Sequence, residues 1–132
     1  MSFSAANTIA SVWPLISGMT VLNTPGGQRT FNVVAVSANG VTVTPGSTSM
    51  VVPRSAFENA IQYLHDHNHD RRGPCVINAK TVPEEAGPLC RASRLTTTGS
   101  FGPRNITYVL PILQALGLVE IEPKSPARTW IL

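Results

Sequence analysis

Three histidines alternate with acidic and amide residues in one short stretch of the chain. His65, His67 and His69 are separated by single residues, and Asp66 and Asp70 lie among them. Imidazole and carboxylate groups bind divalent metals, but on a continuous helix only His65 and His69, four residues apart, share a face. Because structural zinc needs four ligands, the pattern favours a polar helix end, where histidine suits the negative dipole terminus. We therefore predict no metal and no cofactor, with a divalent-metal site as the alternative.

The two cysteines, Cys75 and Cys90, are too few for a disulfide framework and are not spaced as a zinc ribbon requires. We predict free thiols, half buried in the core. Redox sensing is the alternative, since Arg91 lies next to Cys90 and a cationic neighbour favours the reactive thiolate.

Motifs of nucleophilic, phosphate-binding or dinucleotide-binding enzymes do not occur in the sequence. The pair Glu84-Glu85 follows Pro83, which is typical of a helix start rather than of a catalytic carboxylate pair. The seven acidic residues are scattered along the chain. We predict that the protein is not an enzyme.

Charge is distributed unevenly along the 132 residues, although the net value is only +3. Residues 1–53 carry a single charged side chain, that of Arg29. Between Ala86 and Val119 the only charged side chains are those of Arg91, Arg94 and Arg104. We therefore predict two regions with different tasks, residues 1–53 and residues 54–132.

The first region is predicted to be a helix followed by short strands. Apolar residues recur at helical spacing over residues 4–16, and Asn39-Gly40 is typical of a tight hairpin turn with positive φ. Tight turns between short β-branched segments indicate a small antiparallel meander, which we expect to brace the second region. The predicted strands cover residues 19–24, 30–37, 41–44 and 49–52.

The second region is predicted to alternate helices and short strands. Ser55 and Glu58 have the spacing of a capping box at the start of a helix that runs to about residue 67. A further helix is expected from Pro83, and a strongly apolar one from residue 103 or 104 to Leu116, which Gly117 ends. The predicted strands are 75–77, 118–122 and 128–132.

This order of elements resembles the winged helix-turn-helix domains of bacterial regulators. The resemblance covers about the last 80 residues. It rests on the segment Leu113-Gln114-Ala115-Leu116-Gly117-Leu118-Val119-Glu120-Ile121 and, after a short gap, on Arg128-Thr129-Trp130-Ile131-Leu132. In that family a leucine-glycine-leucine turn leads from a helix into a strand, a basic loop and a second strand. The fold class implied is α+β, a helix and small antiparallel meander packed on a winged helix.

The resemblance implies that the chain binds double-stranded DNA, as a regulator or as the target-reading part of a defence or mobile-element system. The apolar helix would be the recognition helix, whose N-terminal residues face the groove. Residues expected at the groove are Arg104, Asn105, Thr107 and Tyr108. Residues expected at the phosphate backbone are Arg94, Thr97, Thr98, Ser100, Lys124 and Arg128.

Two features of the sequence depart from the family pattern. Pro111 lies within the proposed recognition helix, and Glu120 and Glu122 stand beside a short wing. The main alternative is therefore a protein-interaction module, an adaptor or inhibitor that docks through the winged helix. A ligand-responsive regulator with a pocket between the two regions is the third reading. Docking predicts an exposed apolar patch near the recognition helix, whereas DNA binding predicts positive potential there.

Location and assembly follow from weaker signals. No run of 18 or more apolar residues occurs, and the first residues lack the pattern of a signal peptide. We expect a cytoplasmic protein with no membrane partner. A homodimer is expected as well, because paired winged helices read paired half-sites.

Overall fold

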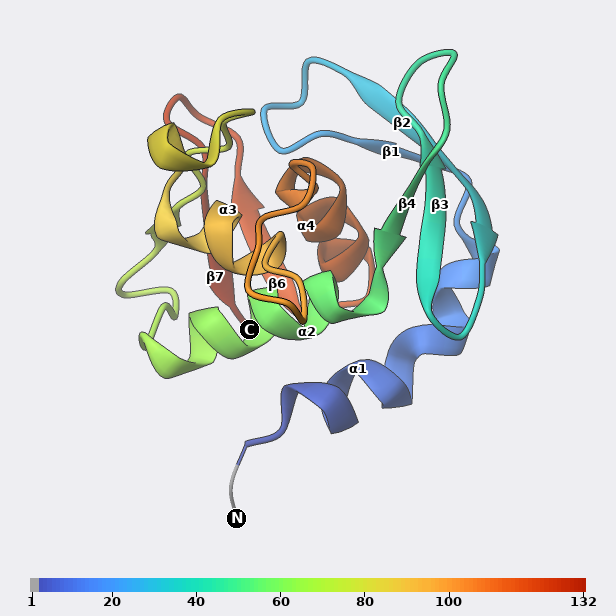
Figure 1. The fold of residues 1–132 in the computed structure, drawn as a ribbon. Helices are drawn as coiled ribbons and strands as arrows, with labels where there is room; N and C mark the ends of the chain where they lie inside the picture. Colours follow the sequence, from blue (N-terminus) through green and yellow to red (C-terminus); the bar gives the residue numbers. More distant parts are fainter. Residues whose placement is uncertain (1–2) are drawn as a thin grey trace.

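Helices and two antiparallel sheets share one hydrophobic core in this chain. The structure, a computed structural model, describes residues 3–132 and confirms the predicted α+β class. One sheet lies on one side of helix α4, the second sheet and α3 lie on the other, and α2 and α1 run below them (Figure 1). The elements in chain order are α1 (Ala5–Val12), η1 (Trp13–Gly18), β1 (Val21–Asn23), β2 (Thr30–Val36), β3 (Gly40–Thr44), β4 (Met50–Pro53), α2 (Arg54–Asp66), β5 (Cys75–Val76), η2 (Pro83–Glu85), α3 (Pro88–Ser93), α4 (Ile106–Ala115), β6 (Val119–Glu122) and β7 (Arg128–Ile131).

The first sheet is the predicted antiparallel meander, with strand order β1-β2-β3-β4. The predicted helix over residues 4–16 is shorter than expected, because α1 ends at Val12 and a 3-10 helix, η1, follows. Pro14 lies in η1 and has no N–H to donate to an α-helical ladder. The Trp13 indole instead donates a hydrogen bond to the Ser37 carbonyl at 2.8 Å, which attaches η1 to the sheet.

The hairpin between β2 and β3 forms as predicted, but its turn is of a different kind. Neither Asn39 nor Gly40 has positive φ, so the expected turn is wrong. Gly40 is needed for another reason: a Cβ there would lie 2.8 Å from the Val52 carbonyl oxygen on β4. The glycine lets β3 and β4 approach each other.

Helix α2 begins differently from the sequence prediction. Pro53 occupies the cap position and no side chain caps the helix, so the prediction of a capping box formed by Ser55 and Glu58 is wrong. Glu58 instead forms an ion pair with Arg54 one turn earlier, at 3.7 Å. The helix predicted from Pro83 is also divided, since residues 83–85 form the short 3-10 helix η2 and α3 starts only at Pro88.

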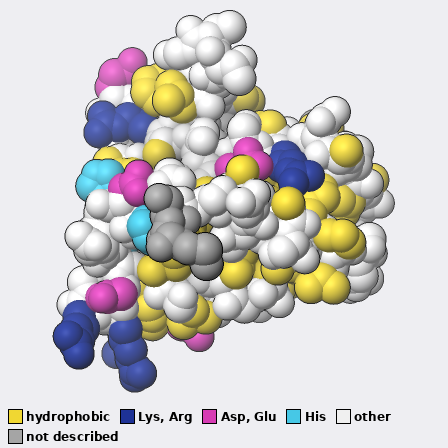
Figure 2. Space-filling view, turned by 90° about the horizontal axis from the view of Figure 1, so that it is seen from below, with side chains coloured by type: hydrophobic (Ala, Val, Ile, Leu, Met, Phe, Trp, Pro, Cys, Tyr) yellow, Lys and Arg dark blue, Asp and Glu magenta, His cyan; other side chains and the backbone are white. Residues whose placement is uncertain are grey.

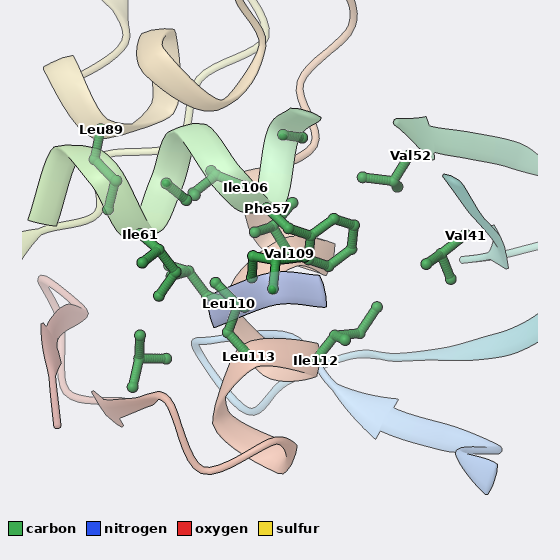
Figure 3. Close-up of a cluster of buried hydrophobic side chains, with 14 of the residues drawn as sticks. Val41, Val52, Phe57, Ile61, Leu89, Ile106, Val109, Leu110, Ile112 and Leu113 are labelled. Carbon is green, nitrogen blue, oxygen red and sulfur yellow. The ribbon is translucent and has the colours of Figure 1, made fainter. Parts of the chain in front are cut away.

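Helix α4 is the centre of the core. Six of its ten residues are buried, among them Leu110 and Ile112. Figure 3 shows side chains of α4 between Val41 and Val52 of the first sheet and Leu89 of α3. A helix that is apolar on nearly every side belongs to a core rather than to a surface. Gly117, with φ of 80°, ends the helical segment as predicted.

The second sheet has the strand order β5-β7-β6. From α2 onward the chain follows the predicted order of helix, strand, helix, helix, strand, strand. The assignment of this order to winged-helix proteins stays a prediction. Among the described residues, no helix combines the length and apolarity needed to cross a membrane.

Candidate interaction surface

The residue expected to read adenine, Asn105, is buried. Only 3% of its surface is exposed, and its Nδ2 donates to the Ser93 carbonyl at 3.3 Å. Its Oδ1 accepts no hydrogen bond within residues 3–132. Because α3 and the start of α4 enclose the side chain, the predicted groove-facing position of Asn105 is wrong.

Arg94 was expected at the phosphate backbone but is a structural residue of the interior. It is 5% exposed, and its guanidinium donates to the carbonyls of Gly102 at 2.8 Å, Lys80 at 2.8 Å and Thr81 at 2.9 Å. These three bonds hold the loop before η2 against the segment that leads into α4. The predicted phosphate contact of Arg94 is wrong, because the side chain is buried and three of its N–H groups donate to backbone carbonyls.

The face of α4 that was expected to be polar and free is covered by the first sheet. Tyr108 packs edge-to-face on Phe31 of β2, with ring centroids 5.2 Å apart. The Thr107 hydroxyl is buried and has no hydrogen-bond partner among the described residues. Because its hydroxyl is buried, the predicted groove-facing role of Thr107 is wrong. Tyr108 is partly buried with its ring against Phe31, and its groove-facing role stays a prediction.

The hydroxyls of the turn before α4 bond mainly to one another. Thr96 Oγ1 lies 3.0 Å from Thr98 Oγ1 and 2.8 Å from Ser100 Oγ, while Thr97 is exposed beside them. Arg104, at the end of this segment, is partly exposed. The predicted phosphate contacts of Thr97, Thr98 and Ser100 thus lie on an exposed turn, where nothing in the fold blocks access to them.

The two basic residues of the predicted wing differ in their surroundings. Lys124 is exposed in the β6–β7 loop. Arg128 instead donates from Nε to Glu122 Oε1 at 3.1 Å and from Nη2 to the same oxygen. This hydrogen bond from Arg128 lowers the pKa of Glu122. The charge of Arg128 is therefore largely compensated within its own strand pair.

The three histidines lie at the end of α2 and in the loop that follows. His67 Nδ1 lies 3.0 Å from the Tyr63 carbonyl, and His69 Nδ1 lies 2.7 Å from the Gly73 carbonyl. His65 stacks on Phe3 instead, with ring centroids 3.9 Å apart. Within residues 3–132 no three His, Cys, Asp or Glu side chains are grouped so as to hold a metal ion.

Both cysteines are buried as free thiols. Burial raises the pKa of the Cys75 thiol to about 11. At neutral pH the thiol is therefore protonated and a poor nucleophile. For Cys75 this surrounding favours the predicted inert core thiol over redox sensing.

The outer face of the first sheet carries no charged side chain. Strand alternation turns Phe31, Val33 and Val41 inward and leaves the other side of the sheet to solvent. Its most exposed apolar members are Val21, at 54%, Val34, at 55%, and Val51, at 63%. The remaining outward side chains are those of Asn23, Thr30, Asn32, Ala35, Thr42, Thr44 and Pro53.

A cleft of about 280 Å³ adjoins this face at β4. One wall is β4 with the start of α2, and the other is the segment from Ser93 to Asn105. Leu95 and Phe101, which form an isolated bridge across this segment, are 43% and 46% exposed beside it. Arg94 is the one charged residue that lines the cleft, and its guanidinium is bonded to backbone carbonyls.

Viewed from below, the molecule shows the same contrast (Figure 2). Most dark-blue Lys and Arg side chains lie on the left of this view, and the right side is mainly yellow and white apart from one dark-blue side chain next to magenta. The cleft was not predicted from the sequence, because it is formed by segments about 45 residues apart. The uncharged face does have a signal in the sequence, because residues 1–53 contain a single charged side chain.

No protein-family model matches the chain, and neither a curated protein nor a solved structure is significantly similar to it.

Proposed function

We propose that this chain is a protein-interaction module, which docks on a partner through the uncharged outer face of its first sheet. The observation that carries the proposal is that face itself, where Val21, Val34 and Val51 are exposed and no charged side chain occurs. The centres of protein interfaces are depleted of charged residues, and exposed apolar side chains without charged neighbours suit such a site.

The surroundings of α4 favour docking over base reading. A recognition helix must present one polar face to the groove. Asn105 and Tyr108 are instead engaged with Ser93 and Phe31, and the neighbouring surface carries the exposed apolar side chains Leu95 and Phe101. An apolar patch at this place is what the docking hypothesis predicts.

DNA binding through the winged helix stays a prediction that lacks this support. Arg104, Lys124 and the turn at Thr97 are the members of the expected site that remain open to a phosphate backbone. The homodimer and the cytoplasmic location also stay predictions.

Site-specific photo-cross-linking tests the docking proposal. A photoreactive amino acid replaces Val34 on the sheet face or, as the control, Val76 on β5, which is an exposed strand valine at 44%. The variants are irradiated in the cells that produce the protein. We expect one discrete cross-linked protein from position 34, none from position 76, and loss of the product when Val51→Lys is added.

Two results would contradict the proposal. One is the absence of any product from position 34 while the variant remains folded. The other is a product that persists unchanged when Val51→Lys places a charge on the same face.

A further inference from the structure

The free edge of β4 has unused backbone hydrogen-bonding groups. β4 is the last strand of its sheet. The Arg54 N–H donates to the Asn39 carbonyl at 2.8 Å, and the Val52 carbonyl oxygen points at Gly40 of β3. Because the ladder groups alternate along an antiparallel strand, the N–H and C=O of Val51 point away from β3. Within residues 3–132, no turn, loop or side chain bonds to either group.

The cleft beside this edge is suited to an uncharged occupant. Met50, Val51 and Pro53 line it on the side of β4, and Leu95 and Pro103 lie on the opposite side. The Arg94 guanidinium in the wall already donates to three carbonyls. A cationic side chain entering the cleft would lose its hydration and meet the charge of Arg94, whereas an apolar side chain would match the apolar lining.

The wall of the cleft includes a buried amide, that of Asn105. Asn105 is 3% exposed and lines the cleft. Since its Nδ2 donates to the Ser93 carbonyl, the orientation of the amide is fixed and Oδ1 is left as the unpaired atom. Because this oxygen has almost no accessible surface, Asn105 forms a buried part of the wall and offers no contact to an occupant.

We propose that the partner contributes an extended, uncharged segment that adds to the edge of β4 as a further strand. This inference rests on the proposed docking function. The segment pairs with the N–H and C=O of Val51 and places an apolar side chain in the cleft between β4 and Leu95. Its β-branched face continues the outer face of the sheet, as in other strand additions to an exposed edge. A helical ligand does not fit, because its backbone groups are already paired.

A short blocked peptide tests strand addition directly. The probe is N-acetyl-Val-Thr-Val-amide, which is uncharged and extended, titrated into the isotope-labelled full chain and followed by amide NMR. We expect saturable shifts of the Val51 amide and the Leu95 amide. The Val76 amide, on the other sheet, should not move.

Two pairs of variants distinguish backbone pairing from nonspecific binding of the peptide. Val51→Pro removes the edge N–H without removing a bond to β3 and should weaken peptide binding about tenfold or more. Val51→Thr retains the N–H and should bind as the wild type does. Leu95→Lys places a charge at the cleft and should also abolish binding, whereas Val76→Lys should not; this pair keeps the test valid if Val51→Pro fails to fold.

The outcomes distinguish this inference from the docking proposal. Peptide binding that is lost in Val51→Pro and Leu95→Lys supports strand addition. No saturable shifts in the wild type, or equal binding by Val51→Pro, overturns strand addition even if cross-linking from position 34 succeeds. Failure of cross-linking with intact peptide binding overturns only docking through the sheet face.

Discussion

The two sheets of this protein present opposite kinds of surface to solvent. The outer face of β1–β4 has exposed valines and no charge, whereas the outer face of β5-β7-β6 carries Glu120, Glu122 and Arg128. In the second sheet Arg128 is bonded to Glu122, and Glu120 accepts from Gln114 at 2.6 Å. The charged side chains of the second sheet are thus paired with one another or with Gln114, while the first sheet leaves apolar side chains exposed.

Helix α4 also has a different role from the one that its sequence predicts. The helix lies between the two sheets, and its side chains are buried in the core on both sides (Figure 3). A helix in this position couples the regions before and after residue 53. The first sheet covers the predicted recognition helix on one side and turns an uncharged face to solvent on the other.

The largest expected effect tests this coupling. Leu110→Ala removes a fully buried side chain from α4 and should lower the free energy of unfolding by about 2–5 kcal/mol. Urea unfolding should give one midpoint, whether followed by the fluorescence of Trp13 in single-tryptophan Trp130→Phe or of Trp130 in Trp13→Phe. Two separate transitions would show that the two regions unfold independently, and would contradict the coupling through α4.

The next effect separates two arginines that the sequence places in one site. Arg94→Ala leaves three carbonyls without their donor and should cost about 2–4 kcal/mol, while the partly exposed Arg104→Ala should change stability by about 0.5 kcal/mol or less. Arg94→Lys should not restore stability, since one ammonium group lacks the planar fork of donors. Chemical denaturation of the three variants makes the measurement, and equal losses at Arg94 and Arg104 would contradict the assignment.

A smaller effect concerns the pH dependence of the charged region. Burial raises the pKa of Cys75 to about 11, so the folded state holds the thiol proton more tightly than the unfolded chain. The resulting stabilisation is full below a pH of about 8.5 and is lost as pH rises toward the folded pKa. We expect stability to fall more steeply above this pH in the wild type than in Cys75→Val. Parallel pH profiles of the two proteins would show that Cys75 is not buried in this way.

The smallest effect is expected at Glu122. The hydrogen bond from Arg128 lowers the pKa of Glu122, so its stabilisation is present above the unfolded pKa and is lost as pH falls through the folded value. Glu122→Gln should therefore lower the melting temperature slightly at neutral pH and leave it unchanged in strong acid. Because the pair is exposed, high salt should reduce the difference. A difference in melting temperature that does not depend on salt would show that the Glu122–Arg128 pair is shielded from solvent.

Local patterns were sufficient to predict much of the fold. Alternation of apolar residues predicted the meander, and helical spacing with Gly117 predicted α4 and the strand after it. The errors concern positions where tertiary contacts override local preference. Ser55 has the spacing of a cap, but the chain enters α2 directly from Pro53, so no capping bond forms.

The candidate site was harder to predict than the fold. Arg94 and Asn105 have the side chains that read nucleic acids, yet both are buried by segments far away in the sequence. The packing of the first sheet on α4, through contacts such as Phe31 with Tyr108, is not encoded in any short motif. The edge of β4 became visible only once the strand order was known.

The most direct test of the central claim, that α4 belongs to the core and does not read DNA, is fluorescence anisotropy with a random-sequence duplex across a salt series. The wild type is compared with the Arg104→Ala/Lys124→Ala double variant. We predict that the two proteins bind equally weakly and with the same salt slope. Steeply salt-dependent binding by the wild type, with a shallower slope in the double variant, would contradict this claim, because it would place the duplex at the start of α4 and at the β6–β7 loop.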